Sequence, residues 1–350
     1  MKHFIVLSIL FCFLQTTFSA GATSPYKEKM NEGVNTLVEW RDESGIWMKA
    51  GWWNSANILT AMLRYADVTS QKERFAPIIK DLFDKTKTQQ EGNYINEYYD
   101  DEGWWLLAWV EAYKLTGERE YLDMAKVIFN DMATGWSPEC NGGIFWKKPK
   151  QYKNAIANSL FNLSAARLYW ITKDEMYKEW FLKNSEWFLQ SGMIQEDGMV
   201  FDGTKECKPT GREFTYNHGV AMAWLTELYL LTGKKDYLKK AELIADAAIK
   251  NLVFPSSGIL KEFQEPNNLG ADGIQFKGIF MRHLGFLYKV SKKKEYKAFI
   301  LKNADSIIAT NYDAQSKSFG SFWVGPFDKP HPGGHSSAME AIIEAYVLTK

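Results

Sequence analysis

The stretch Tyr113-Lys114-Leu115-Thr116-Gly117 is followed shortly by Tyr121-Leu122-Asp123-Met124-Ala125. The same pair recurs as Tyr229-Leu230-Leu231-Thr232-Gly233 and Tyr237-Leu238-Lys239-Lys240-Ala241. Neighbouring copies are 48 to 60 residues apart when less regular copies are included, which surround Tyr65, Tyr169, Tyr288 and Tyr346. A repeat of this length indicates one supersecondary unit that is used several times along the chain.

Each copy predicts a helix, a short turn and a second helix. Apolar residues spaced three or four apart, such as Leu106, Val110 and Tyr113, form one apolar stripe along a helix. Gly117 and Gly233 stand where the end of a helix favours a left-handed residue. Alternating strand patterns with hairpin turns are scarce, so we predict an all-α protein.

Counting these helices predicts the architecture. Helices that end in such a turn should begin near Trp53, Asp101, Ala155, Thr215, Ile274 and His335. Helices of the other kind should begin near Tyr26, Gln71, Glu118, Lys173, Lys234 and Lys292. Six and six make a closed double ring, an (α/α)6 barrel. The first set is rich in Ala, Gly and Trp and should form the inner ring, whereas the second carries Lys and Glu on one face and should form the outer ring.

The predicted connections are unequal in length. Those that lead from an outer to an inner helix are long, and they cover residues 43–52, 87–100, 133–154, 191–214, 252–273 and 311–334. All six lie on one rim in this topology, and they hold most of the Gly and Pro. Long loops on a rigid scaffold are where binding sites are usually built, so we expect a ligand cleft at the N-terminal ends of the inner helices.

The composition of the chain limits the classes of ligand that we expect. The 42 basic and 42 acidic side chains cancel, whereas a nucleic acid or an anionic membrane would normally leave a basic footprint. Aromatic residues make up 15 % of the chain, more than a core of this size requires. They indicate either a surface that stacks on flat ligand faces such as sugar rings, or a core that uses aromatic side chains heavily.

The N-terminus resembles a secretory signal. Phe4–Leu14 is a short apolar run, and Ala20-Gly21-Ala22 fits the small-residue cleavage pattern. We therefore expect residues 1–22 to be a signal peptide and residues 23–350 to be a single catalytic domain, secreted or periplasmic. Cys12 lies inside the apolar run with no lipobox before it, and no later run is apolar enough to span a membrane. The two remaining cysteines, Cys140 and Cys207, form either one disulfide or two buried thiols.

The run Asn96–Trp105 (NEYYDDEGWW) is the strongest chemical feature. Asp100 and Asp101 open the second inner helix, where carboxylates can simply cap amides and face the positive end of the helix dipole. Here, however, Gly and two Trp follow them on the rim where aromatic-rich loops converge. Two carboxylates beside a stacking surface are the minimal equipment for glycoside hydrolysis, so we predict that this pair is catalytic.

Several separated motifs resemble glycoside hydrolase family 76, the endo-acting α-1,6-mannanases. They are Asp100–Trp105 (DDEGWW), Gly142–Trp146 (GGIFW), Tyr152–Ile156 (YKNAI), Thr215–Gly219 (TYNHG) and Asp272–Phe280 (DGIQFKGIF). The resemblance covers nearly all of the chain after residue 22 and implies an (α/α)6 fold. It also implies a retaining mechanism, with Asp100 as nucleophile and Asp101 as acid/base. His218 departs from the pattern, because the family usually has Gln there.

Geometry independently favours retention. Neighbouring Cα atoms are about 3.8 Å apart, and two side chains at a helix start diverge by about 100°. Adjacent carboxyl groups should then lie roughly 5–7 Å apart, a range that includes the about 5–5.5 Å of retaining enzymes and only just reaches the about 6.5–9.5 Å of inverting ones. We expect burial and the charge of Asp100 to raise the pKa of Asp101, and the helix N-terminus to keep Asp100 ionised.

Other residues on the same rim are candidate sugar contacts. They are Trp53, Asn54, Trp104, Asn154, Tyr216, Asn217, Asp272, Gln275 and Lys277. For Asp272, Gln275 and Lys277, helix capping and solubility are equally good explanations. Trp105 is a packing residue in this interpretation, and Asp202 is a turn residue that could also border the cleft.

The sequence predicts no metal and no cofactor. His331 and His335 have the spacing of zinc ligands on a helix, but Pro332-Gly333-Gly334 between them argues against a helix. We expect a monomer that acts on α-mannan or manno-oligosaccharides, with no nucleic-acid partner and no membrane span. Three alternatives stay open: a transglycosidase on the same scaffold, a catalytically silent glycan-binding protein, and another (α/α)6 enzyme such as an unsaturated uronyl hydrolase. Endo and exo action are not distinguished.

Overall fold

The computed structural model describes residues 24–149 and 152–350. The expected signal peptide and its cleavage site lie outside the described residues. Six helices form the inner ring: α2 (Trp52–Val68), α4 (Tyr99–Thr116), α6 (Ala155–Thr172), α8 (Thr215–Thr232), α10 (Gly270–Ser291) and α12 (Pro332–Thr349). Six more surround them: α1 (Pro25–Glu39), α3 (Lys72–Thr86), α5 (Arg119–Thr134), α7 (Glu175–Gln190), α9 (Lys235–Asn251) and α11 (Lys294–Thr310).

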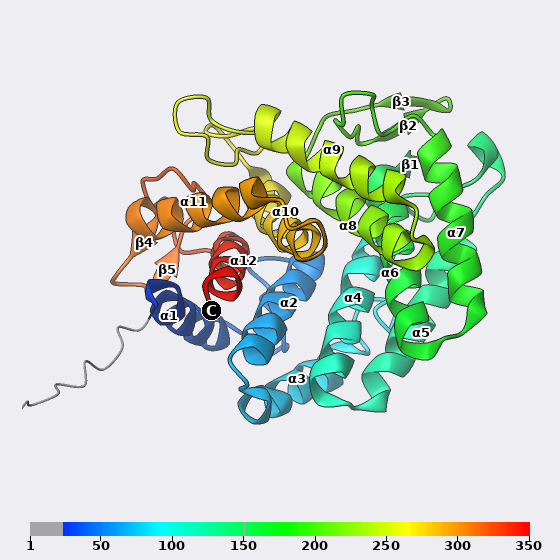
Figure 1. Ribbon diagram of the computed structural model, residues 1–350. Coiled ribbons are helices and arrows are strands. Elements are labelled where there is room, and N and C mark those ends of the chain that lie inside the picture. Colours follow the sequence, from blue (N-terminus) through cyan, green and yellow to red (C-terminus); the bar gives the residue numbers. More distant parts are fainter. Residues whose placement is uncertain (1–23, 150–151) are drawn as a thin grey trace, which may run out of the picture.

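The inner ring closes on itself. Each inner helix contacts the next, and α12 returns to contact α2, as Figure 1 shows along the ring from blue to red. The predicted (α/α)6 barrel is therefore confirmed. Inner helices are buried on nearly every side; in α8 even Asn217, His218 and Thr226 are inaccessible to solvent. Outer helices bury only one face, because their Lys and Glu side chains face water.

The six tyrosines of the repeat occupy equivalent positions in the last turn of the inner helices. The carbonyl of each one accepts the backbone N–H of the residue four further on, as in Tyr113 with Gly117 (2.7 Å) and Tyr288 with Lys292 (2.9 Å). Gly117 and Gly233 adopt the predicted left-handed conformation, with φ of 82° and 71°. The repeat is thus a helix-ending device, and it explains why all inner-to-outer turns are short.

One expectation about the last inner helix was wrong. Pro332-Gly333-Gly334 lies inside α12, which begins at Pro332 with His331 as its N-cap. Proline is favoured in the first turn of a helix, because the N–H that it lacks would have no helical partner there. His335 nevertheless does not face His331 in a metal site: its ring bonds the carbonyl of Gly33 and the N–H of Phe319.

Two glycines let inner helices approach each other closely. A Cβ on Gly278 of α10 would lie 2.6 Å from the Cα of Ser337 in α12, and a Cβ on Gly219 of α8 would lie 2.8 Å from the Cα of Phe280 in α10. Both distances are shorter than real atoms allow. Any larger residue would therefore push these helices apart and widen the ring.

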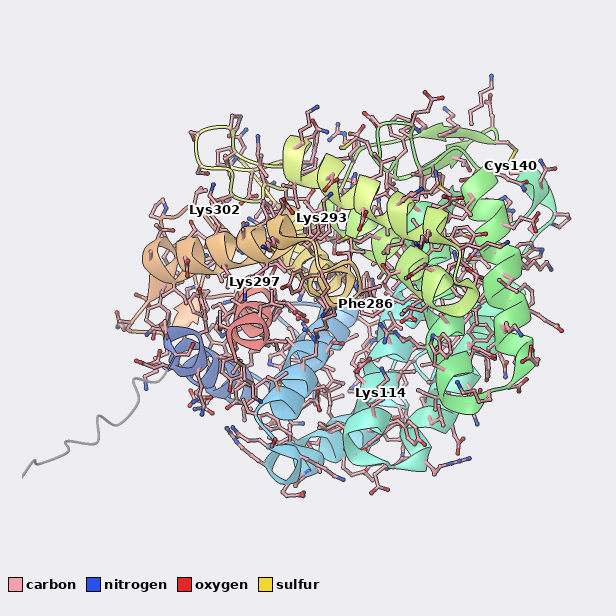
Figure 2. The ribbon with its side chains drawn as sticks, viewed as in Figure 1. Lys114, Cys140, Phe286, Lys293, Lys297 and Lys302 are labelled. Atoms are coloured by element: carbon pink, nitrogen blue, oxygen red, sulfur yellow. A yellow bond between two sulfur atoms is a disulfide. The ribbon has the colours of Figure 1, made fainter. Side chains whose placement is uncertain are left out.

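Strands are confined to the long loops. β1 (Lys153–Asn154), β2 (Gly203–Lys205) and β3 (Lys208–Thr210) form one small antiparallel sheet, and β4 (Tyr312–Asp313) pairs with β5 (Ser318–Phe319). Cys140, in the short 3-10 helix η1 (Glu139–Asn141), is disulfide-bonded to Cys207 in the turn between β2 and β3. Figure 2 labels Cys140 at the edge of the molecule beside these strands. Of the two alternatives for the cysteines, the structure has the disulfide. None of the described helices is apolar over a stretch long enough to cross a bilayer.

The repeat yields a stability prediction. Lys173 and Lys292 occupy the position of Gly117 in two copies and hold φ of 59°, which is unfavourable for a side chain with a Cβ. We expect Lys173→Gly and Lys292→Gly each to raise the free energy of unfolding by about 0.5–1 kcal/mol, since relief of the left-handed strain outweighs the added freedom of the unfolded chain. Urea denaturation followed by circular dichroism measures this.

Thr69→Gly is the matched control for these two variants. Thr69 ends α2 at the same position of the repeat but has φ of −103°, where glycine gives no relief. Its stability should stay equal or fall. A gain from Thr69→Gly, or no gain from either lysine variant, would contradict this account.

Candidate active site

A cleft of about 550 Å³ opens at the N-terminal ends of the inner helices, on the rim that the long loops form. Four inner helices and the loops between them supply its walls. The lining residues are Trp53, Tyr98, Asp100, Asp101, Trp104, Trp146, Tyr152, Asn154, Asp202, Phe214, Tyr216, Asp272 and Phe276. The cleft therefore combines eight aromatic side chains with four carboxylates.

Asp100 lies in the first turn of α4 and faces the loop that carries Trp146. Its Oδ2 accepts the Trp146 indole N–H at 3.0 Å, while its Oδ1 is buried and has no donor among the described residues. Burial and the neighbouring charge of Asp101 raise the pKa of Asp100 well above its usual range. We expected the helix N-terminus to keep Asp100 ionised. That expectation differs from the structure, because the loss of hydration outweighs the backbone amides.

Asp101, the next residue, has a different partner. The side-chain amide of Asn96 donates to Asp101 Oδ2 at 2.7 Å. Burial raises the pKa of Asp101 to about 7, with a further contribution from the charge of Asp272, and the Asn96 hydrogen bond limits the rise. Because burial opposes the ionisation of both neighbouring carboxyls, the two titrate as a coupled pair.

Glu102 connects α4 to the loop that carries Asn96. Its side chain is fully buried, accepts the Asn96 backbone N–H at 3.3 Å, and pairs with the Lys148 ammonium at 2.8 Å. Burial raises the pKa of Glu102 to about 9. Asn96 in turn accepts the N–H of Tyr98 at 2.8 Å, so its amide is fixed on the side that donates to Asp101. Glu102 is thus a positioning residue in the helix that carries the catalytic candidates.

Asp202 enters the cleft from the long loop before α8, although the sequence favoured a turn residue there. Tyr152 donates its hydroxyl to Asp202 Oδ2 at 3.0 Å, and the Asn217 amide donates to Oδ1 at 3.1 Å. Burial raises its pKa. The signal that could have revealed Asp202 is that both partners lie in the family motifs.

Aromatic side chains form one wall of the cleft. Tyr216 and Phe276 stack at 3.9 Å with their planes 7° apart, and Trp53 lies 6.1 Å from Phe276 and 5.9 Å from Trp104. The Trp53 indole donates to Asp272 at 2.8 Å. A continuous aromatic wall with carboxylates at its edge suits a sugar, which stacks its apolar face and donates its hydroxyl groups.

Other candidates from the sequence are placed outside the lining. Asn54 donates to Gln275 at 3.3 Å and Gln275 to Ser336 at 2.7 Å, and all three are buried between inner helices. Lys277 is buried in an ion pair with Glu265. Asn217 lies behind Asp202.

His218 has no contact with the cleft either. It accepts the N–H of Val200 at 3.0 Å and bonds the carbonyl of Phe214 at 2.8 Å, and burial lowers its pKa to about 4. The neutral imidazole therefore fastens the loop before α8. Sequence reasoning also passed over Tyr98, Trp146, Tyr152, Phe214 and Phe276 as site residues, together with Asn96. Within residues 24–149 and 152–350, no three His, Cys, Asp or Glu side chains are grouped as a metal site would require.

The fold and the cleft define a class: (α/α)6 barrels with a carboxylate pair among aromatic side chains at the N-terminal mouth of the inner ring. The chain belongs to glycosyl hydrolase family 76, whose family model matches residues 15–350.

Curated relatives and solved structures agree with this membership. The mannan endo-1,6-alpha-mannosidase DCW1 of Saccharomyces cerevisiae is 26 % identical over 85 % of this chain and 72 % of its own length. The Candida albicans protein of the same name is 28 % identical over 67 % of this chain and 57 % of its own length. A relative from Schizosaccharomyces pombe is 29 % identical over 58 % of this chain, which spans about half (48 %) of that protein.

Two solved structures superpose over most of both chains. The GH76A α-1,6-mannanase from Salegentibacter sp. HEL1_6 has a TM-score of 0.82 and 26 % identity, covering 92 % of this chain and 99 % of its own. A variant of that enzyme with two consecutive aspartates replaced by alanine is described as inactive and was solved with α-1,6-mannotetrose. The Lin0763 protein from Listeria innocua has a TM-score of 0.82 and 26 % identity over 93 % of this chain.

The Asn96 contact yields a prediction on titration. Asn96→Ala removes the donor that stabilises ionised Asp101, so the pKa of Asp101 should rise above about 7. Carbonyl 13C NMR of protein labelled at aspartate, titrated with pH, measures the shift. Gln315→Ala, in an exposed loop, is the control and should leave it unchanged. A pKa that is unchanged or lower in Asn96→Ala would refute the role given to Asn96.

Proposed function

We propose that this protein is a retaining, endo-acting α-1,6-mannanase that hydrolyses the backbone of yeast-type α-mannan or a related α-1,6-mannoside. One observation carries the proposal: two consecutive, partly buried carboxylates, Asp100 and Asp101, share a cleft with an aromatic wall. Glycoside hydrolysis needs one carboxyl that gives a proton and one that attacks as a carboxylate, and two coupled carboxyls side by side can divide these roles.

The two carboxyls have different roles in this mechanism. Asp101, with a pKa raised to about 7, protonates the oxygen of the leaving mannoside. Asp100 attacks the anomeric carbon and forms a mannosyl ester. Asp101, now ionised, then takes a proton from water, which attacks the same carbon and releases Asp100. The adjacency of the two residues in one helix turn supports retention, because adjacent side chains of roughly 5–7 Å separation include the about 5–5.5 Å that retaining enzymes use.

The loop contacts prepare this chemistry. The Trp146 indole holds Asp100 from one side and the Asn96 amide holds Asp101 from the other. Fixed hydrogen bonds of this kind keep reacting groups in place before the substrate arrives, so less reorganisation is needed in the transition state.

The substrate class rests on the relatives and on the cleft. The curated relatives are named mannan endo-1,6-alpha-mannosidases, and the related Salegentibacter enzyme is an α-1,6-mannanase whose variant lacking two consecutive aspartates is inactive. In this chain Trp53, Trp104 and Tyr216 would stack on mannose rings. Asp202, Asp272 and Asn154 would accept or donate hydrogen bonds to hydroxyl groups.

We further propose that the protein acts outside the cytoplasm, as a monomer with residues 1–22 as a removable leader and residues 23–350 as one catalytic domain. The Cys140–Cys207 disulfide supports this, since such bonds persist mainly in oxidising compartments. Polymeric mannan is also a substrate that a cell meets at or beyond its surface.

Replacing either catalytic aspartate tests the activity. Asp100→Ala and Asp101→Ala should each lower turnover of linear α-1,6-mannan by about 10²–10⁴-fold, because each removes one half of the acid/base and nucleophile pair. Both variants should keep the wild-type circular dichroism spectrum and still bind α-1,6-mannotetraose. Asp123→Ala, an exposed carboxylate on α5, should retain full activity. Wild-type protein that fails to cleave α-1,6-mannan but binds it would support a glycan-binding role instead.

The stereochemical outcome tests the mechanism. Proton NMR of the earliest products should show the new reducing end first as the α anomer, because two inversions at the anomeric carbon restore the original configuration. A β anomer appearing first would make Asp100 a base that activates water. The same assay with an added acceptor glycan distinguishes hydrolysis from transglycosylation, which would lengthen the acceptor and release little reducing sugar.

A further inference from the structure

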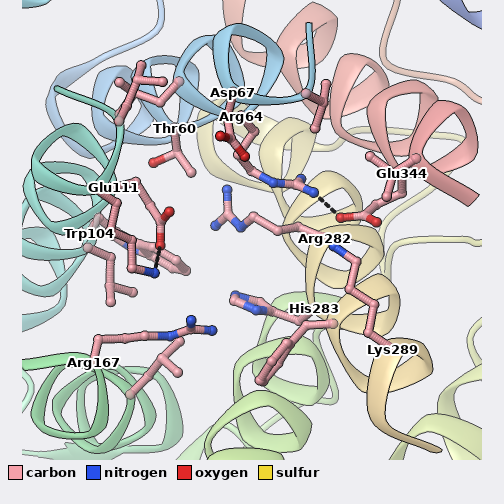
Figure 3. A pocket seen from close by; sticks show the side chains of 18 residues that line it. Thr60, Arg64, Asp67, Trp104, Glu111, Arg167, Arg282, His283, Lys289 and Glu344 are labelled. Atoms are coloured by element: carbon pink, nitrogen blue, oxygen red, sulfur yellow. Dashed lines mark hydrogen bonds and ion pairs between the residues drawn. The ribbon is translucent and has the colours of Figure 1, made fainter. Parts of the chain in front are cut away.

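A second cavity lies at the opposite end of the barrel. Its volume is about 340 Å³, and the C-terminal halves of five inner helices line it (Figure 3). Its titratable lining consists of Arg64, Asp67, Glu111, Lys114, Arg167, Arg282, His283, Lys289 and Glu344. Trp104 lines both this cavity and the catalytic cleft, whereas Asp100 and Asp101 line only the cleft. We call this hollow the C-terminal cavity.

Two of the arginines that line the C-terminal cavity have a structural role. Arg64 pairs with Glu340 and Glu344, which joins α2 to α12 where the ring closes. Arg282 pairs with Glu340 at 2.7 Å and donates to Asn57 at 2.9 Å. Cations also suit this end of the barrel, because it gathers the negative ends of the inner-helix dipoles. These two arginines are therefore committed to holding helices together.

Arg167 has fewer partners than Arg64 and Arg282. Its Nε forms an ion pair with Glu227 at 3.0 Å, and its guanidinium lies 4.8 Å from the centre of the Phe286 ring. No other acceptor for it exists among the described residues, so both terminal amino groups are unfilled. Figure 3 shows this guanidinium reaching into the cavity toward His283. Guanidinium groups with two free donors on one side match the paired oxygens of a carboxylate or phosphate.

His283 faces the same space. Only 6 % of the residue is exposed, and its Nε2 is buried with no partner in the described part of the chain. Burial and the charges of Arg282, Arg167 and Arg64 hold its pKa well below the usual range, so the imidazole is neutral. A buried polar atom without a partner normally costs about 1–3 kcal/mol, and a bound ligand would satisfy it.

Two more groups define the electrostatics of the cavity. Lys289, six residues after His283 in α10, makes no ion pair with a described residue. Glu111 is the carboxylate that interacts with Arg167; although burial opposes it, Lys114 at 2.9 Å and Arg167 lower its pKa. The unfilled donors, from Arg167, His283 and Lys289, thus lie on α6 and α10, and Glu111 beside them already has a cation. Two acids lie on the facing helices: Glu344, which pairs with Arg64 through Oε1 and has a buried, unpartnered Oε2, and Asp67, which makes no ion pair with a described residue.

We propose that the C-terminal cavity binds a small oxyanion, a phosphate or carboxylate group, between the terminal amino groups of Arg167, the Nε2–H of His283 and the ammonium of Lys289. This site is independent of the proposed mannanase activity. The volume is at the lower end of small-molecule sites, which hold about 300–1,000 Å³, so the oxyanion can be carried by a molecule of monosaccharide size.

Calorimetric titration of the full chain with inorganic phosphate, at constant ionic strength in a buffer without other oxyanions, tests the site. We expect saturable binding of one phosphate per chain. A parallel titration with malonate distinguishes the source of the oxyanion: the tighter of the two identifies phosphate or carboxylate as the natural group. The imidazole 15N signals of His283, assigned with His283→Phe, should shift on binding.

Variants separate this site from general surface charge. Arg167→Lys keeps a cation for Glu227 but loses the planar pair of donors, so binding should weaken about tenfold or more. His283→Phe should weaken it severalfold, and it breaks no hydrogen bond of the free protein. Lys289→Gln should also weaken binding, whereas Lys292→Gln, on the same helix end but outside the lining, should not.

Two results would overturn the proposal. One is the absence of saturable phosphate and malonate binding to the wild-type protein. The other is binding that persists unchanged in both His283→Phe and Lys289→Gln, which would move the oxyanion to another part of the surface. These two variants decide the matter even if Arg167→Lys fails to fold, because neither His283 nor Lys289 has a side-chain partner among the described residues to lose.

Discussion

The close approach of the inner helices is the constraint on which the rest of the structure depends. At Gly278 and Gly219 the backbones of α8, α10 and α12 come together at distances that leave no room for a Cβ. A ring this narrow brings the N-terminal turns of α4, α8 and α10 to a single mouth, and with them Asp100, Tyr216 and Asp272. The cleft is therefore a consequence of backbone packing below it, and the loops add to a geometry that the ring has already fixed.

The parallel arrangement of the inner helices gives the barrel two electrically different ends. The mouth is lined by carboxylates without guanidinium groups, whereas the C-terminal cavity has three arginines alongside its acids, a difference that the helix dipoles favour. The dipole is nevertheless the weaker influence on the aspartate pair, because burial raises the pKa of both Asp100 and Asp101 despite their place in the first turn of α4. Trp104 lines both the cleft at the N-terminal mouth and the C-terminal cavity, so its side chain lies between the two.

The repeat of tyrosines allowed the ring to be predicted, because each copy encodes a local event: the end of a helix. The position of the carboxylate pair in a cleft could also be predicted, because the two aspartates and their aromatic neighbours are consecutive residues at a helix start. Asp202 and Lys277 show where such reasoning stops. Asp202 looks like a turn residue until Tyr152 and Asn217 are brought to it from distant segments. Lys277 stands in a family motif, yet the direction of its side chain depends on Glu265 in a loop that the motif does not include. The choice between a disulfide and two thiols likewise required the positions of two loops.

The division of labour between ring and loops also bears on how the pair is tuned. The ring sets where Asp100 and Asp101 stand, but the only side-chain donors to them among the described residues, Trp146 and Asn96, come from loops. Those loops are themselves fastened: Glu102 holds the Asn96 segment, and the Cys140–Cys207 disulfide ties the Trp146 segment to the hairpin that follows Asp202. Because a hydrogen bond to an ionised carboxylate lowers its pKa, a change in either loop alters the proton affinity of one aspartate and leaves the helices untouched. The proton affinity of this pair can thus vary through loop sequence alone, while α4 fixes the place of both aspartates in the chain fold.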